Sequence, residues 1–248
     1  MSDIKILVAM HKKYWIPKDD VYVPLHVGAA GKKADWRCVG DDSGDNISKK
    51  NIYYCEMTGL YWAWKNLDCD YIGLCHYRRY FMKRILGMSL HIYGRKDYEK
   101  IMEKNDILLP NPSACIPSIL SHYKKYHKEK DLLITGDIIK ELYPEYYDDF
   151  LDVIHGQCMY FNNMFCMKKS IFDEYCSWIF SILFELEKRI DINDYDDYQK
   201  RVFGFIAERL MPVFVKHKKL KIKHSEILFL EKEGIKRKIQ TWIQKKIY

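Results

Sequence analysis

The hydrophobic pattern of the chain alternates between two periods. Short apolar runs bounded by turn residues predict strands, and longer stretches with apolar positions three or four residues apart predict helices. The expected strands are residues 4–9, 35–39, 71–75, 106–109 and 159–167. The expected helices are residues 48–66 with Ser48 as the cap, 97–104, several short ones within 118–147, then 170–189 and 195–210. This alternation predicts an α/β fold.

Polar clusters directly follow the first three expected strands. Residues 11–13 read His-Lys-Lys, residues 41–46 form an acidic turn, and residues 76–79 read His-Tyr-Arg-Arg. Open α/β sheets bind their ligands at the carboxyl ends of the strands. If these strands are parallel neighbours, the three clusters line one crevice.

The third cluster has the chemistry of a phosphate site. Arg78 and Arg79 carry planar forks of donors that match phosphate oxygens, and His76 shares a face with Arg78 in an extended segment. These cations would stabilise the negative charge of a departing diphosphate. The alternative is a structural ion-pair cluster.

The acidic turn offers hydrogen-bond acceptors for a nucleoside. Asp41, Asp42 and Asn46 could contact a base edge or ribose hydroxyls, together with His11 after the first strand. The alternative is an ordinary Asx turn, because Asp, Ser, Gly and Asn are the residues that turns prefer.

The triplet Asp68-Cys69-Asp70 has the spacing of a Mg²⁺ or Mn²⁺ site. It precedes the strand 71–75, so we expect it at the opposite edge of the sheet, as a solvated turn. No residue is therefore assigned as a metal ligand, and a dependence on Mn²⁺ or Mg²⁺ stays open.

Candidate catalytic groups lie later in the chain. Glu208 is a carboxylate on an otherwise apolar helix, and burial would raise its pKa toward the range of a general base. The alternative is a salt bridge with Arg209 or Arg201. Asp137 and His76 are the other catalytic candidates.

The middle of the chain and the aromatic helix before it supply candidate contacts for an acceptor. His122 and His155 lie in a Tyr-, His- and Lys-rich stretch that could form a lid. Trp62 lies in the helix 48–66 and could stack on a sugar ring, although core packing is the usual role of such a residue. Glu56, on the same helix, faces away from its apolar side.

The net charge of +7 is concentrated in the last part of the 248 residues. Residues 216–248 hold eleven Lys and Arg against three Glu, a balance of +8, which leaves −1 for residues 1–215. We therefore divide the chain into a domain, 1–215, and a basic tail, 216–248. Within the tail, residues 235–247 have one apolar helical face with a Trp, which suits either an anionic membrane surface or docking on the domain.

The 8 cysteines lie mostly inside apolar runs and none has CxxC spacing. They are expected to be reduced core residues of a cytoplasmic protein. Neither a secretory signal nor a spanning helix is expected.

Several blocks resemble a family of bacterial glycosyltransferases from capsular and exopolysaccharide gene clusters, long described only as a domain of unknown function. The most specific are Tyr-Trp-Ala-Trp-Lys-Asn at 61–66 and His-Tyr-Arg-Arg-Tyr-Phe at 76–81. Further blocks include residues 6–11, 24–31 and 201–210, so the resemblance spans roughly residues 4–212, and the basic tail falls outside it.

The resemblance implies transfer of a sugar from a nucleotide donor, a UDP-sugar, to a lipid-linked or oligosaccharide acceptor in capsule, exopolysaccharide or O-antigen synthesis. It implies a GT-A-like fold, a Rossmann-type and mostly parallel sheet flanked by helices, with a helical acceptor-side region. The protein would work in the cytoplasm, peripherally on the inner face of the plasma membrane, through its basic C-terminal helix.

The rival hypothesis is a non-catalytic module that binds nucleic acid or a membrane surface, because Lys-rich segments alternate with aromatic residues. Against a nucleic-acid partner, the basic charge is confined to the tail, and the crevice mixes Asp with Arg.

Overall fold

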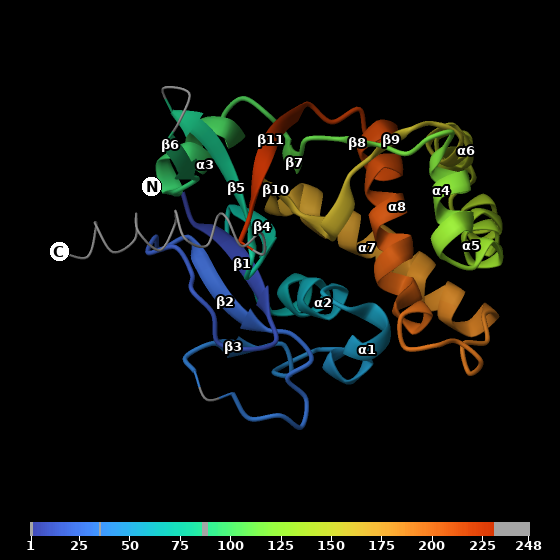
Figure 1. Ribbon diagram of the computed structural model, residues 1–248, viewed down its shortest axis with the longest axis horizontal. Coiled ribbons are helices and arrows are strands. Elements are labelled where there is room, and N and C mark those ends of the chain that lie inside the picture. The colour runs from blue at the N-terminus through green and yellow to red at the C-terminus, as the bar shows by residue number, and fades with distance from the viewer. Residues whose placement is uncertain (1, 35, 86–88, 231–248) are drawn as a thin grey trace.

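A nine-stranded mixed β-sheet forms the centre of the computed structural model, which describes residues 2–34, 36–85 and 89–230 (Figure 1). Its spatial order is β3-β2-β1-β4-β10-β7-β11-β5-β6. The strands are β1 (Ile4–Met10), β2 (Tyr22–His26), β3 (Val39–Gly40), β4 (Tyr71–His76), β5 (Arg79–Ile85), β6 (Ser89–Ile92), β7 (Ile107–Pro110), β10 (Phe165–Lys168) and β11 (Ile222–Phe229). A separate ribbon pairs β8 (Ser113–Ala114) with β9 (Cys158–Met159).

The predicted α/β class is confirmed, but the sheet is mixed where a mostly parallel one was expected. Strands β3, β2, β1 and β4 are parallel neighbours, and β7 is parallel to β11. Strand β10 runs antiparallel to both β4 and β7, and β5 runs antiparallel to both β11 and β6. The polar clusters expected at strand ends therefore follow strands of the parallel half of the sheet.

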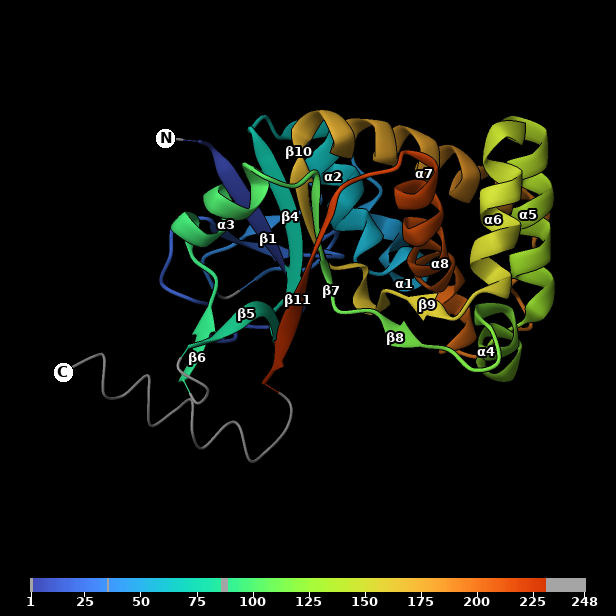
Figure 2. The same cartoon turned by 90° about the horizontal axis from the view of Figure 1, so that it is seen from above.

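Helices cover the sheet mainly on one face, in two successive layers (Figure 2). The layer next to the sheet contains α2, α7 and α8, and α4, α5 and α6 pack outside α7 and α8. The α-helices are α1 (Asn51–Tyr54), α2 (Met57–Asn66), α3 (Arg95–Met102), α4 (Ile119–Tyr126), α5 (Glu129–Leu142), α6 (Tyr147–His155), α7 (Lys169–Arg189) and α8 (Val202–His217). Short 3₁₀ turns are Ser48–Lys50, Pro144–Tyr146, Phe161–Asn163 and Gln199–Arg201.

Both faces of the sheet are buried, which explains the continuous apolar run in β1. Leu7 and Ala9 point into the large core beneath the helices, and Ile6 and Val8 point into the second core on the opposite face. A strand with two covered faces reads as an uninterrupted apolar segment because its alternating side chains all avoid water.

Two predicted elements are interrupted by residues with positive φ. The helix expected over 48–66 breaks at Cys55, with φ 52° and ψ −134°, between α1 and α2. Ser48 does not cap it; its hydroxyl donates to Asp41 and accepts from the amide of Ala30. The strand expected over 159–167 breaks at Asn162 and Asn163, which have φ 76° and 50°.

The strand expected over 35–39 is shorter and lies beside a strand, β2, that the sequence pattern did not predict. Residue 35 lies outside the described residues, 36–38 form no strand, and only Val39–Gly40 pairs, with β2. Strand β2 takes the place expected for the second strand, next to β1.

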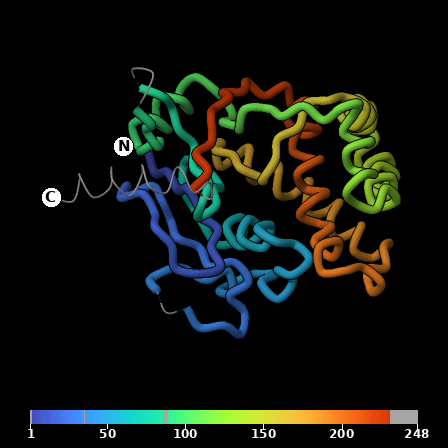
Figure 3. Tube along the Cα trace, in the orientation of Figure 1, coloured from blue at the N-terminus to red at the C-terminus, as the bar shows by residue number. Residues whose placement is uncertain are grey.

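The segment assigned to the basic tail contributes to this sheet. Strand β11 lies between β7 and β5, and Leu228 packs into the core of the second face. Figure 3 shows the trace returning from α8 to the sheet through this strand. The amphipathic helix expected over 235–247 lies outside the described residues.

Candidate active site

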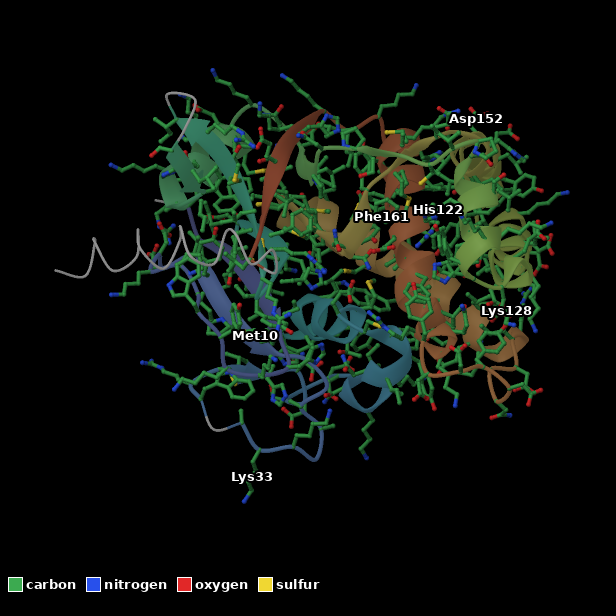
Figure 4. All side chains as sticks on the ribbon, in the orientation of Figure 1. Met10, Lys33, His122, Lys128, Asp152 and Phe161 are labelled. Carbon is green, nitrogen blue, oxygen red and sulfur yellow. The ribbon has the colours of Figure 1, made fainter. Side chains whose placement is uncertain are left out.

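A polar cavity of about 490 Å³ opens at the carboxyl ends of β1 and β4, on the face covered by the helices. Met10, labelled in Figure 4, ends β1 directly before His11, and β4 ends at His76. The two strands are parallel, with Ala9 opposite His76, so their ends meet. The cavity is lined by His11, Asn51, Ile52, Cys55, Glu56, His76, Tyr77, Arg78, Arg79, Asn162, Asp197, Arg201 and Glu208.

One wall of the cavity is cationic and comes from the tight connection between β4 and β5, where His76 pairs with Arg79. The guanidinium carbon of Arg78 lies 5.0 Å from the centroid of the Tyr77 ring and 5.3 Å from that of Tyr14. The guanidinium of Arg79 lies 5.8 Å from the Phe229 ring. Aromatic faces attract guanidinium groups, so these rings contribute to the position of both cations at the cavity.

The carboxylates of the cavity are Glu56, Asp197 and Glu208, which we call its acidic wall, and Glu208 comes from α8. Its side chain is 16% exposed. Oε1 accepts a hydrogen bond from the backbone N–H of Asn162 at 2.7 Å, and Oε2 lies 2.7 Å from Nη1 of Arg209. Burial raises the pKa of Glu208, while Arg209 and the Asn162 amide oppose that rise. A raised pKa makes a carboxylate a stronger base, which suits a group that takes a proton.

Glu56 is a second carboxylate of the cavity, from the break between α1 and α2. Its Oε1 accepts from Nδ2 of Asn163 at 2.8 Å, and the same Nδ2 donates to the carbonyl of Gly204 in α8. Neighbouring Cys55 accepts from Nε of Arg201 at 3.2 Å. Burial raises the pKa of the Cys55 thiol to about 11, so it is not a thiolate at neutral pH.

The two histidines of the cavity differ in their surroundings. Nε2 of His76 lies 2.7 Å from the carbonyl oxygen of Asn162. Partial burial at the cavity rim lowers the pKa of His11, and Glu56 opposes this shift. His11 is therefore neutral at pH 7 and can both donate and accept hydrogen bonds.

The structure brings five of the predicted site residues into this cavity: His11, His76, Arg78, Arg79 and Glu208. In the sequence, Glu56 stood out without a role and Arg201 only as a possible salt-bridge partner of Glu208, whereas Asn162 and Asp197 were not expected at the site. Only weak signals in the sequence indicate these residues. Glu56 and Arg201 are charged residues in aromatic and apolar segments, and Asn162 and Asn163 form a polar pair where a strand was expected.

The predicted nucleoside ligands of the acidic turn do not line the cavity. Asp41 is fully buried, and its carboxylate accepts from the backbone N–H groups of Gly28 and Ala29 and from the hydroxyls of Ser48 and Thr58. These four donors occupy it inside the protein. Asp42 is exposed, and the amide of Asn46 donates to the carbonyl of Gly44 within the turn.

The predicted acceptor ligands and Asp137 also lie outside the cavity. Trp62 is buried in the core and donates from Nε1 to Ser43 at 2.9 Å, as expected of a packing residue. Asp137 is exposed on α5 and lines a separate pocket with Glu141 and Arg189. His155 is exposed at the end of α6. His122, on α4, packs against Phe161.

Replacing Asp41 by Ala should lower the free energy of unfolding by about 2–4 kcal/mol, because four buried donors lose their acceptor. Urea unfolding followed by circular dichroism measures this. Asp42→Ala is the matched control, and its exposed side chain should change stability by about 0.5 kcal/mol or less. An Asp41→Ala protein that keeps its stability but loses nucleotide binding would restore Asp41 as a nucleoside ligand.

The end of β4 does not offer the ligands that Mg²⁺ or Mn²⁺ prefer, which are carboxylate, carbonyl and water oxygens. Asp70 precedes β4, at the opposite end from His76, where its Oδ2 accepts from the amide of Asp3. Among the described residues, no three or more His, Cys, Asp or Glu are grouped so as to hold a metal ion. The cavity end of β4 presents imidazole and guanidinium groups instead.

Fold and site together are those of an α/β domain with a polar cavity at its strand ends, lined by guanidinium groups and carboxylates. The chain belongs to the family described as a domain of unknown function, DUF4422, whose model matches residues 5–219. The family resemblance found in the sequence is therefore confirmed.

A solved structure extends this comparison. The chain is similar to the apo structure of WbbM, a bifunctional glycosyltransferase, with a TM-score of 0.81 and 35% sequence identity. The match covers 92% of this chain and 45% of the WbbM chain, so this chain spans less than half the length of WbbM. No curated protein matches the chain.

Proposed function

We propose that this protein is a glycosyltransferase that moves a sugar from a nucleotide donor to a glycan acceptor within the cavity at the ends of β1 and β4. The observation that carries the proposal is the placement of Arg78 and Arg79 and of the buried Glu208 in one cavity. Similarity to WbbM supports the reaction class, because that protein is a glycosyltransferase.

The cationic wall would bind the diphosphate of the donor. The fork of Arg78 can meet two phosphate oxygens at once, and His76 and Arg79 lie on either side of it in the same turn. When the bond from the anomeric carbon to the phosphate oxygen breaks, its electron pair stays on the nucleoside diphosphate. Fixed positive groups lower the energy of that developing charge.

The acidic wall would act on the acceptor. The acceptor oxygen forms a bond to the anomeric carbon, and its proton passes to Glu208. Arg209 and the Asn162 amide hold the Glu208 carboxylate in one orientation before the reaction. Glu56, oriented by Asn163, is placed to accept hydrogen bonds from hydroxyls of the bound sugar.

The finer features of the proposal come from the sequence resemblance. They are a UDP-sugar donor, transfer of a hexose, and a lipid-linked or oligosaccharide acceptor in capsule, exopolysaccharide or O-antigen synthesis.

None of the helices in the described part of the chain is both long and apolar enough to cross a bilayer. Peripheral membrane contact through residues 235–248 rests on the sequence alone, and co-sedimentation with anionic liposomes, with and without those residues, would test it.

A thermal-shift screen of nucleotide sugars tests the donor site. At a donor concentration 100 times its Kd, mass action stabilises the native state by about 2.7 kcal/mol, which raises Tm by roughly 5–10 °C. We expect a UDP-sugar to give this shift, both with Mn²⁺ and with EDTA. Arg78→Ala should lose the shift, and a screen in which no nucleotide sugar raises Tm would contradict the proposal.

A further inference from the structure

A cluster of aromatic rings lies beside the cavity, where α4, the turn before α8 and α8 itself meet. We call it the aromatic platform, and it consists of His122, Tyr126, His127, Phe161, Tyr198 and Phe205. Figure 4 shows His122 and Phe161 beside each other, near the middle of the molecule.

The platform has two rows, and each contains a ring that is close in the chain to a cavity residue. In the first, Phe161 contacts His122 with ring centroids 5.6 Å apart, and His122 contacts Tyr126 at 4.9 Å. Phe161 directly precedes Asn162, which lines the cavity. This row therefore leads from the cavity along one side of α4.

The second row contains Phe205, Tyr198 and His127. Phe205 lies 4.1 Å from His127 and 5.0 Å from Tyr198, again between ring centroids. Tyr198 directly follows Asp197, a cavity residue, and Phe205 lies one helical turn before Glu208. Both rows thus begin within one or a few residues of groups that line the cavity.

Two rings of the platform are open to solvent. Tyr126 is 47% exposed and Tyr198 is 51% exposed. The other exposed large apolar side chains in the described part of the chain are aliphatic: Val39, Ile52, Ile85, Ile116, Leu133 and Leu142. Exposed aromatic rings are therefore concentrated beside the cavity, which core packing does not explain.

The rings of the platform are held in place, and cations lie against two of them: Nζ of Lys125 is 5.2 Å from the centroid of the Tyr126 ring, and the guanidinium of Arg201 is 5.4 Å from that of Phe205. Nε2 of Gln199 donates to the carbonyl of Tyr126 at 2.7 Å, which ties the turn before α8 to the end of α4. Burial, reinforced by Arg209, lowers the pKa of His127 to about 4 and lowers that of His122. Both imidazoles are neutral at pH 7, so they can stack and can exchange hydrogen bonds with hydroxyl groups.

We propose that Tyr126 and Tyr198 form a subsite that binds a sugar ring of the glycan acceptor by stacking. The inference rests on the proposed function. A pyranose has an apolar C–H face and polar edges, which match single exposed tyrosines flanked by His122, Gln199 and Asp197. A docking protein or a lipid would instead need one continuous apolar patch.

The test uses the full chain on an array of immobilised oligosaccharides from bacterial surface polysaccharides. Wild-type protein should bind a subset of the array, and Tyr126→Ala and Tyr198→Ala should each weaken that binding about tenfold. Tyr198→Phe keeps the stacking face and should bind as the wild type does. Leu133→Ala is the matched control, because Leu133 on α5 is exposed to a similar extent as the two tyrosines. This variant should bind glycans as the wild type does.

Three outcomes are informative. Binding that is unchanged in the Tyr126→Ala/Tyr198→Ala double variant, or a wild-type protein that binds no glycan, overturns the subsite. Donor hydrolysis, measured as nucleoside diphosphate release without acceptor, should be the same in these variants and the wild type. Glycan binding that depends on the tyrosines, in a protein that neither hydrolyses nor transfers from any donor, would overturn the proposed function and leave the subsite standing.

Discussion

Glu208→Gln is expected to slow sugar transfer by about 10²–10⁴-fold, the usual contribution of a positioned general base. The amide keeps the size of the side chain and an oxygen for Arg209 or the Asn162 N–H, but it cannot take the proton of the acceptor hydroxyl. Release of nucleoside diphosphate in the presence of acceptor measures the rate, and thermal unfolding shows whether the variant is folded.

The pH dependence gives a second readout. Burial raises the pKa of Glu208, and a base must be ionised. The wild-type rate should therefore fall as the pH decreases through that raised pKa, at a higher pH than for an ordinary Glu, whose pKa is about 4.3. The residual rate of Glu208→Gln should lack this acidic limb.

Glu141→Gln is the matched control for this substitution. Glu141 is also paired with an arginine, Arg189, but on the surface of α5. The transfer rate and the pH profile of the Glu141→Gln protein should equal those of the wild type. A folded Glu208→Gln protein with wild-type turnover would remove Glu208 from the reaction and leave Glu56 as the candidate base.

Arg78→Ala is expected to reduce transfer by about 10²–10³-fold, because the departing diphosphate loses a fixed positive group. The same variant should bind the nucleoside diphosphate more weakly, which isothermal titration calorimetry measures. Arg78→Lys should recover only part of the loss, since an ammonium cannot form the two parallel hydrogen bonds of a guanidinium.

Arg84→Ala controls for the loss of a positive charge nearby. Arg84 lies on β5, as Arg79 does, but its Nε donates to Glu226 on the surface. Binding of the nucleoside diphosphate and turnover should both stay at the wild-type level. Equal turnover in Arg78→Ala and wild-type protein would assign the diphosphate to another group.

The elements that could be predicted from the sequence are those whose pattern is local. Strands β1, β4 and β7 are short apolar runs with polar ends, and α7 is a long amphipathic segment, so burial alone indicates them. Strand β11 was missed because its partners, β5 and β7, lie more than 100 residues away in the chain. Its lysines and histidine suggested a solvated tail.

The residues of the candidate site also divide into those that a local sequence pattern indicates and those that only the fold brings together. The clusters at His11 and His76 could be placed together because parallel strands bring their ends to one edge. Asp41 has the sequence context of a ligand-binding acid, and only the fold shows that its carboxylate organises the loop at Gly28 and Ala29. The role of Glu56 depends on the turn at Asn163, which no local pattern reveals.

The backbone of Asn162 forms hydrogen bonds with groups on both walls of the cavity. Its N–H donates to Glu208, and its carbonyl oxygen lies within hydrogen-bond distance of His76. Asparagine tolerates the left-handed conformation, φ 76°, that this residue adopts. His76 and Glu208 are therefore coupled through two hydrogen bonds to the backbone of one amino acid, so a displacement of either side chain is transmitted to the other.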